Sequence, residues 1–140
     1  MDLNYFKKTR ILDGGMGQEL LAKGLISKGT LWSTSALLDE KFHQLLIDVH
    51  KSFIYAGADV IVTNNFSSRK VRLIQNKVED KFVYVNKKAC ELANKAREIS
   101  KENILVAGSL PPQNGTYVID ERNINTIKKD FKEQAEIIKP

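Results

Sequence analysis

Three short polar turns hold the residue types that could contact a ligand. The first contains Asp13, Gly14 and Gly15, the second contains Asn64, and the third contains Ser109. A carboxylate can accept hydrogen bonds from an ammonium group, and glycines allow the backbone to bend sharply or to approach a ligand closely. Amide and hydroxyl groups can hydrogen-bond a polar substrate. These residue types could hydrogen-bond a polar ligand.

Two other interpretations of these turns stay open at this point. The glycine-rich turn 13–17 is a poor phosphate-binding loop, because no Lys-Ser or Lys-Thr pair follows and a third glycine at the proper spacing is missing. It could instead be a purely structural turn. The polar residues 63–65 could cap the following helix, a role that Ser67 or Ser68 would also suit.

The other reactive residue types are predicted to be structural. His50 lies beside the apolar stripe of a predicted helix, so we expect a packed, hydrogen-bonded histidine rather than a ligand or base. Trp32 could fix the loop after the first helix, but we expect it to pack at the rim or bottom of the core. Cys90 lies between charged helix residues and is expected to be a small helix residue rather than a nucleophile or metal ligand.

Each polar turn follows a short apolar run, and amphipathic segments lie between the runs. The runs at 58–63 and 103–108 are rich in β-branched residues and nearly continuous, which is typical of strands covered on both faces. The three-four spacing of apolar residues predicts helices, the first of which stops at Gly57. The predicted strands are 10–12, 58–63 and 103–108, and the predicted helices are 40–56, 82–100 and 124–138.

The alternation of strand and helix indicates an α/β protein with parallel strands joined by right-handed crossovers. It is compatible with an open doubly wound sheet or with part of a closed eight-stranded barrel. A complete barrel needs roughly 200 to 250 residues, so three strand-helix units in 140 residues would be a little under half of one. Periodicity does not choose between the two architectures.

Composition narrows the class of protein. No apolar run approaches the roughly 18 to 20 residues that cross a bilayer, and Met1 to Lys8 do not have the pattern of a secretory signal, so we expect no membrane segment and a cytoplasmic protein. The single cysteine fits a reducing compartment. The net charge of +5 arises from basic residues interleaved with acids along the whole chain, so no nucleic-acid partner is expected.

Four segments together resemble the homocysteine S-methyltransferase family. They occur in the family's order and at similar spacing, and they cover almost the whole chain, from about residue 10 to 138. Many members have Gly-Pro where this chain has Pro-Pro at 111–112. The segments are 11–20 (ILDGGMGQEL), 31–33 (LWS), His50 with 56–64 (AGADVIVTN), and 106–112 (VAGSLPP).

The resemblance implies a fold and a domain boundary. The family's fold is the (β/α)8 TIM barrel, and its first strand leads through the glycine turn into a short helix. We therefore expect an α/β chain with an incomplete TIM barrel that consists of the first three βα units with parallel strands. Residues 1–140 would be the N-terminal part of the barrel domain, truncated before strand 4, with Pro140 where the family turns into that strand.

The resemblance also implies a reaction and a site. The family transfers a methyl group to the sulfur of homocysteine, giving methionine. Zinc held by three cysteines binds the sulfur directly, so that it reacts as a thiolate. Asp13, Gly14 and Gly15 would hold the amino-acid end of homocysteine, with Asn64 and Ser109 as further substrate contacts. The tyrosine that approaches the zinc in some relatives has no counterpart, because this chain has Phe-Ser-Ser at 66–68.

None of the three zinc cysteines is present, and one isolated Cys90 cannot replace them. We therefore expect this chain alone to bind no zinc and to show no turnover, with zinc as the cofactor of the complete family domain. The methyl donor could be S-methylmethionine, a betaine-like onium compound or a methylfolate-loaded cobalamin partner.

Two alternatives remain. The chain could be a non-catalytic fragment or subunit that completes a barrel with a complementing C-terminal half, or an unrelated small α/β binding domain with an open sheet. In the fragment case, uncovered strand edges and helix faces predict poor solubility or self-association.

Overall fold

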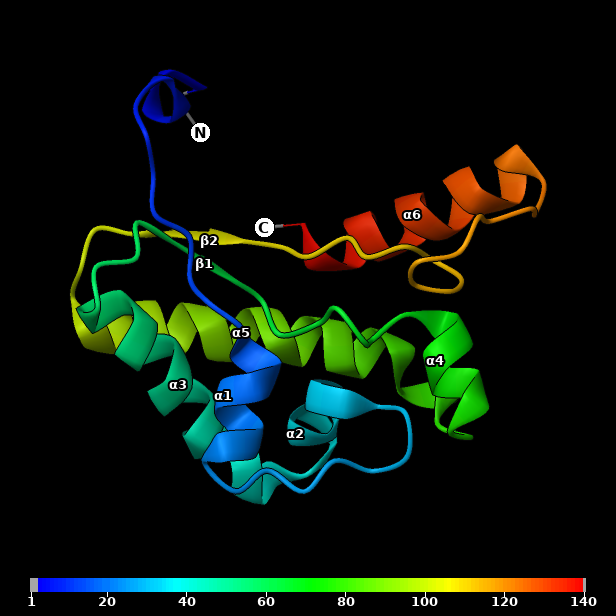
Figure 1. Ribbon diagram of the computed structural model, residues 1–140, viewed down its shortest axis with the longest axis horizontal. Coiled ribbons are helices and arrows are strands. Elements are labelled where there is room, and N and C mark those ends of the chain that lie inside the picture. The colour runs from blue at the N-terminus through cyan, green and yellow to red at the C-terminus, as the bar shows by residue number, and fades with distance from the viewer. Residues whose placement is uncertain (1–2, 140) are drawn as a thin grey trace.

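The computed structural model describes residues 3–139 and places three parallel strand positions side by side (Figure 1). Strand β1 (Val60–Val62) pairs in parallel with β2 (Leu105–Ala107), and Ile61 lies opposite Val106. On the other side of β1, Leu12 forms an isolated parallel bridge with Val60. The spatial order is therefore Leu12, β1, β2, which is the order of the chain.

The strands are shorter than the apolar runs that predict them. The runs at 58–63 and 103–108 each give a three-residue strand, and the run at 10–12 gives only the bridge at Leu12. Ile11 and Leu12 are 60% and 61% exposed. Within residues 3–139 no strand covers their outer side, so the first run lacks the second neighbour that would extend its ladder.

The three long helices confirm the predictions from periodicity. They are α3 (His43–Tyr55), α5 (Phe82–Ser100) and α6 (Ile124–Ile138). A 3-10 turn, η3 (Glu40–Phe42), forms the beginning of the first predicted segment. Gly57 ends that segment as expected, with φ +100° and its N–H donating to the carbonyl of Ile54.

Several short helical elements were not predicted from periodicity. These elements have three to seven residues, which make about one or two turns and are too few to show an amphipathic repeat. Only the short helix after the glycine turn, α1, was implied by the resemblance. The short elements are α1 (Met16–Ala22), α2 (Ser35–Leu38), α4 (Lys70–Gln75), η1 (Leu3–Lys7), η2 (Trp32–Thr34) and η4 (Glu79–Lys81).

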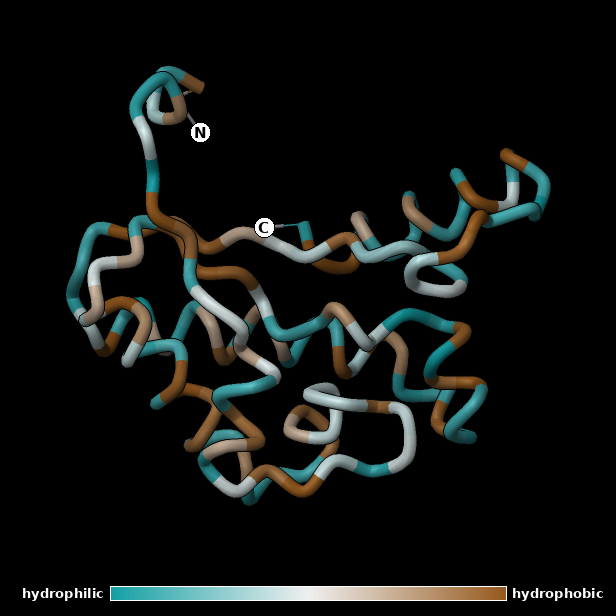
Figure 2. Tube along the Cα trace, in the orientation of Figure 1, coloured by the Kyte–Doolittle hydropathy of each residue, from teal (hydrophilic) through white to brown (hydrophobic). Residues whose placement is uncertain are grey.

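The core lies between the strands and the helices α3 and α5, which pack against each other (Figure 1). Figure 2 shows the strand segments as a mainly hydrophobic part of the trace. On α5 the inward positions Ala89, Ala93 and Ala96 are fully buried, so small side chains let the neighbouring elements approach closely. Ile61 of β1 is fully buried in the same core.

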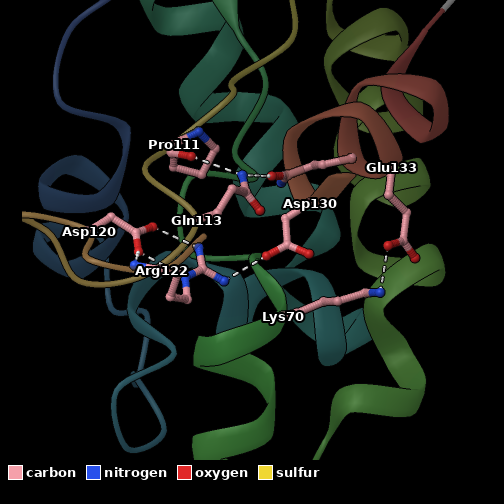
Figure 3. A network of polar contacts seen from close by, with 8 residues as sticks. Lys70, Pro111, Gln113, Asp120, Arg122, Asp130 and Glu133 are labelled. Atoms are coloured by element: carbon pink, nitrogen blue, oxygen red, sulfur yellow. Dashed lines mark hydrogen bonds and ion pairs between the residues drawn. The ribbon is translucent and has the colours of Figure 1, made fainter. Parts of the chain in front are cut away.

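Helix α6 buries little of its surface, in contrast to α3 and α5. Of its residues only Gln134 is buried, and Ile124 is 58% exposed. Polar contacts hold the helix in place: Lys70 pairs with Glu133 at 2.6 Å, and Arg122 bridges two carboxylates that raise the pKa of its guanidinium (Figure 3). The apolar face of α6 is thus only partly covered by the rest of residues 3–139. The turn expected at Pro140 lies outside the described residues.

His50 is packed, as predicted, but it is not hydrogen-bonded. Its side chain is fully buried on α3, and neither ring nitrogen has a partner within residues 3–139. The prediction of a hydrogen-bonded histidine is wrong for this part of the chain, because no described hydrogen-bonding group reaches the buried ring. Burial lowers the pKa of His50 from 6.5 to about 4, so the ring is neutral at pH 7.

Within residues 3–139, no helix combines the length and apolar character needed to cross a membrane.

Candidate functional site

A cavity of about 390 Å³ lies at the carboxyl ends of the three strand positions. Asp13, Gly14, Asn64 and Ser109 all line it, although they come from three different turns. Carboxyl ends of neighbouring parallel strands meet at one edge of a sheet, which brings these turns together. Gly15 is not among the lining residues but is the N-cap residue of α1, so its proposed contact with a substrate stays a prediction.

The Asp13 carboxylate is held firmly at the edge of this cavity. Its backbone N–H donates to the carbonyl of Val60 at 3.0 Å, and its Oδ2 accepts from the N–H of Val62 at 2.9 Å. Burial raises the pKa of Asp13, while the hydrogen bond from Val62 acts in the opposite direction. A carboxylate can accept several hydrogen bonds, so an ammonium group could bind as well and would favour the charged form.

Glycine is required in the first turn because of close packing. A Cβ added to Gly14 would lie 2.8 Å from Cε1 of Phe53, and one added to Gly17 would lie 2.0 Å from Nε1 of Trp32. Neither glycine has a positive φ. The purely structural interpretation of this turn therefore has support, but it does not compete with ligand binding, because both glycines also line the cavity.

Asn64 connects the second turn to the segment around Trp32. Its side chain is 4% exposed, and Nδ2 donates to the carbonyl of Ser33 at 3.0 Å. The alternative that polar residues of this turn cap the following helix is wrong: the N-cap residue of α4 is Arg69, without a side-chain capping bond. Asn64 thus shapes the cavity wall, and a direct contact with a substrate remains a prediction.

The second and third turns are joined by hydrogen bonds at the strand ends. The N–H of Ser109 donates to Oγ1 of Thr63 at 3.1 Å and to Oδ1 of Asn65 at 3.3 Å. Thr63 in turn donates to Asn65 at 2.6 Å. These bonds fix the backbone of Ser109 at the cavity, and its hydroxyl group is the part that could contact a ligand.

A buried network of amide side chains supports these turns from behind, and sequence reasoning missed it. Asn65 donates to Oδ1 of Asn86 on α5, and Gln134 on α6 donates to the same oxygen, both at 2.9 Å. Gln113 donates to Oε1 of Gln134 at 2.7 Å (Figure 3). The sequence held a signal, since Asn86 and Gln134 are amides on the apolar stripes of their helices, where an unpaired amide would be costly.

Trp32 is more than a packing residue. Its side chain is 43% exposed, it lines the cavity together with Phe66, and its φ of +52° is unusual for a bulky residue. Such strained backbone is often found at functional sites. The prediction that Trp32 mainly packs on the core is therefore incomplete, because Trp32 also lines the cavity.

The residues present do not fit a three-thiolate zinc site. Within the described part of the chain, no group of three or more His, Cys, Asp and Glu side chains could hold a metal ion. Cys90 lies half-buried on α5, with its Sγ 3.9 Å from the carbonyl of Ile138. Burial raises the pKa of the Cys90 thiol, which keeps it protonated and argues against a nucleophile or ligand.

The sequence model of the homocysteine S-methyltransferase family matches residues 10–140. The chain belongs to this family. It is 32% identical over 117 residues to homocysteine S-methyltransferase of Escherichia coli (strain K12), an alignment that covers 79% of this chain and 37% of that enzyme. It is 33% identical over 98 residues to S-methylmethionine–homocysteine S-methyltransferase BHMT2 of Rattus norvegicus, covering 70% of this chain and 24% of that protein.

The fold agrees with the family. The crystal structure of the metallated homocysteine methyltransferase MmuM from Escherichia coli superposes on 98% of this chain with a TM-score of 0.75 and 24% sequence identity. The superposition covers 54% of the MmuM chain. This family chain therefore spans only part of its relatives, and it shares the fold of that part.

Proposed function

We propose that this chain supplies the homocysteine-binding part of a homocysteine S-methyltransferase, which transfers a methyl group to the sulfur of L-homocysteine and gives methionine. The observation that carries the proposal is the convergence of Asp13, Gly14, Asn64 and Ser109 on one cavity. In this assignment Asp13 accepts from the substrate ammonium group, and Asn64 and Ser109 contact the rest of the amino acid. The names of the relatives support the same reaction.

The sulfur chemistry needs groups that the described residues lack. A zinc ion in the complete family domain would bind the homocysteine sulfur and stabilise its thiolate, which is the reactive form. Because no suitable ligand set occurs within residues 3–139, we propose that the chain alone holds no zinc and does not turn over. The methyl donor is either an onium compound, such as S-methylmethionine or a betaine, or a methylfolate-loaded cobalamin partner.

We further propose that residues 1–140 form the first three βα units of a (β/α)8 barrel. The parallel order Leu12, β1, β2 and the shared edge of the three turns support this architecture. We propose the cytoplasm as its location, because the single cysteine cannot form an intramolecular disulfide.

The Asp13→Asn substitution should weaken binding of L-homocysteine by about tenfold or more. A hydrogen bond between charged groups contributes on the order of 1.5–3 kcal/mol, and the amide removes the charge while keeping the shape. The measurement is a titration of the purified chain followed by the fluorescence of Trp32, which lines the cavity, at a protein concentration below that at which the chain associates. Glu19→Gln is the matched control, because this α1 carboxylate pairs with Lys23 on the surface and does not line the cavity.

If the Asp13→Asn and Glu19→Gln variants bind L-homocysteine with equal affinity, Asp13 does not contribute to the binding site. Absence of any L-homocysteine binding by the unchanged chain, under conditions where it is folded, would contradict the proposed function of the cavity.

The chain by itself should associate or precipitate at micromolar concentration. Ile11, Leu12 and Ile124 are each more than half exposed, and within residues 3–139 the outer edge of β2 has no partner strand. Light scattering coupled to size-exclusion chromatography measures the state. A monodisperse monomer that unfolds cooperatively would contradict this expectation, whereas co-purification with a chain that supplies the missing cysteines would favour the split-barrel subunit.

A further inference from the structure

Arg69 is a fully buried cation with incomplete hydrogen bonding. It lies directly after the second polar turn and is 2% exposed. Its Nη2 donates to Oγ1 of Thr116 at 2.9 Å, and its guanidinium carbon lies 5.9 Å from the centre of the Phe66 ring. Its Nε and Nη1 are buried and have no partner among the described residues. Two nitrogens of a charged group, which together carry three N–H donors, therefore have no acceptor among the described residues.

Arg72, three residues further along, adds a second cation. Its Nε is also buried without a partner, and within residues 3–139 neither arginine forms an ion pair with a carboxylate. The pKa of Arg69 is lowered mainly by burial and further by the charge of Arg72. Placing two like charges together without a counter-ion is costly, and an anion between them would relieve both penalties.

A small cavity lies where that anion would bind. It has a volume of about 70 Å³ and is lined by Arg69, Arg72 and Gln75 of the α4 region and by Asn114 and Gly115 of the loop opposite. A single water needs about 10–15 Å³ of such volume, so the cavity has room for a few waters or one small oxyanion. Within residues 3–139 the lining contains two cations and two amides but no carboxylate.

We propose that Arg69 and Arg72 bind a small oxyanion, a carboxylate or a phosphate group, in the cavity between α4 and residues 114–115. Guanidinium groups suit this role, because their planar N–H donors match carboxylate and phosphate oxygens. The bound group also ties the loop to α4, adding to the bond between Arg69 and Thr116. The site does not depend on the proposed function.

The surroundings offer two sources for the oxyanion. Arg72 also lines a neighbouring pocket of about 450 Å³ together with Trp32 and Phe66, and these two aromatic residues line the cavity that holds Asp13. The oxyanion is then either free phosphate or the carboxylate end of a longer ligand that lies along this row of pockets.

The test is a titration of the purified chain with inorganic phosphate at constant ionic strength, followed by calorimetry and by thermal unfolding. We expect saturable binding and a rise in Tm, and we expect Arg69→Met and Arg72→Met each to weaken binding at least tenfold. Lys95→Met is the control, because it removes one positive charge from an exposed position of α5. Acetate should compete with phosphate at the same site.

Absence of saturable binding of both phosphate and acetate would overturn the proposal, as would equal weakening by Lys95→Met. If Arg69→Met fails to fold, Arg72→Met decides, since Arg72 is less buried. Relative affinities distinguish the sources: tighter binding of glycine betaine than of acetate assigns the site to the carboxylate of a longer ligand, and tighter binding of phosphate than of either assigns it to free phosphate. Both outcomes keep the oxyanion site, and neither depends on homocysteine binding.

Discussion

Replacing Asn86 with alanine should lower the free energy of unfolding by about 3 kcal/mol or more, because this side chain joins three parts of the fold. Its Oδ1 accepts from Asn65 and Gln134, and its Nδ2 donates to the carbonyls of Ser68 and Phe82. Each buried donor or acceptor that loses its partner costs about 1–3 kcal/mol. The substitution leaves the amides of Asn65 and Gln134 and the carbonyl of Ser68 without this partner.

Urea denaturation of the chain and of the variant measures the effect. Asn94→Ala is the matched control, because Asn94 is on the same helix and donates to the carbonyl of Cys90, four residues earlier, as Asn86 does to Phe82. Asn94 lacks the bonds to the strand turn and to α6, so we expect its loss to be less than about half that of Asn86. Similar losses for the two variants would show that the network contributes little beyond a local helix bond.

The same network explains what the sequence could predict. Helix α5 was predicted with its observed bounds, because Val85, Ala89 and Ala96 repeat at helical spacing over many turns. The joint role of Asn86 and Gln134 could not be predicted, because their contact joins positions 48 residues apart. An amide on an apolar stripe indicates that a buried partner exists, but it does not identify that partner.

Only part of the candidate site could be predicted from the sequence. Asp13, Asn64 and Ser109 could be brought together from sequence, because each follows a strand and parallel strands end at a common edge. Trp32 and Arg69 could not be placed, because Trp32 begins a 3-10 helix of three residues and Arg69 precedes a helix of six residues, both too short to show an amphipathic repeat. The positive φ of Trp32 and the incomplete hydrogen bonding of the Arg69 guanidinium are consequences of tertiary packing. They carry no periodic pattern in the sequence.

The fold should lose stability as the pH falls from about 6.5 to about 4, because of His50. The unfolded chain binds a proton at this histidine near pH 6.5, whereas the folded chain does so only near its lowered pKa of about 4. Between these values the unfolded state holds more protons, so protonation favours unfolding. The contribution of neutral His50 to the free energy of unfolding is fully present above pH 6.5. Between pH 6.5 and pH 4 its loss approaches about 1.4 kcal/mol per pH unit.

Urea denaturation at several pH values between 7.5 and 4.5 measures this slope. His50→Leu should flatten it, and at pH 7.5 the variant should be about as stable as the unchanged chain, because leucine leaves no buried ring nitrogen without a partner. His43→Gln is the control and should keep the slope, since His43 is only partly buried and bonds the carbonyl of Leu37. Burial raises the pKa of Asp13, so above pH 3.8 the folded state binds more protons at this group than the unfolded state does. Through Asp13, a fall in pH therefore stabilises the fold, which is opposite to the effect of His50. A His50→Leu variant with an unchanged slope would contradict the prediction and assign the acid sensitivity to other groups.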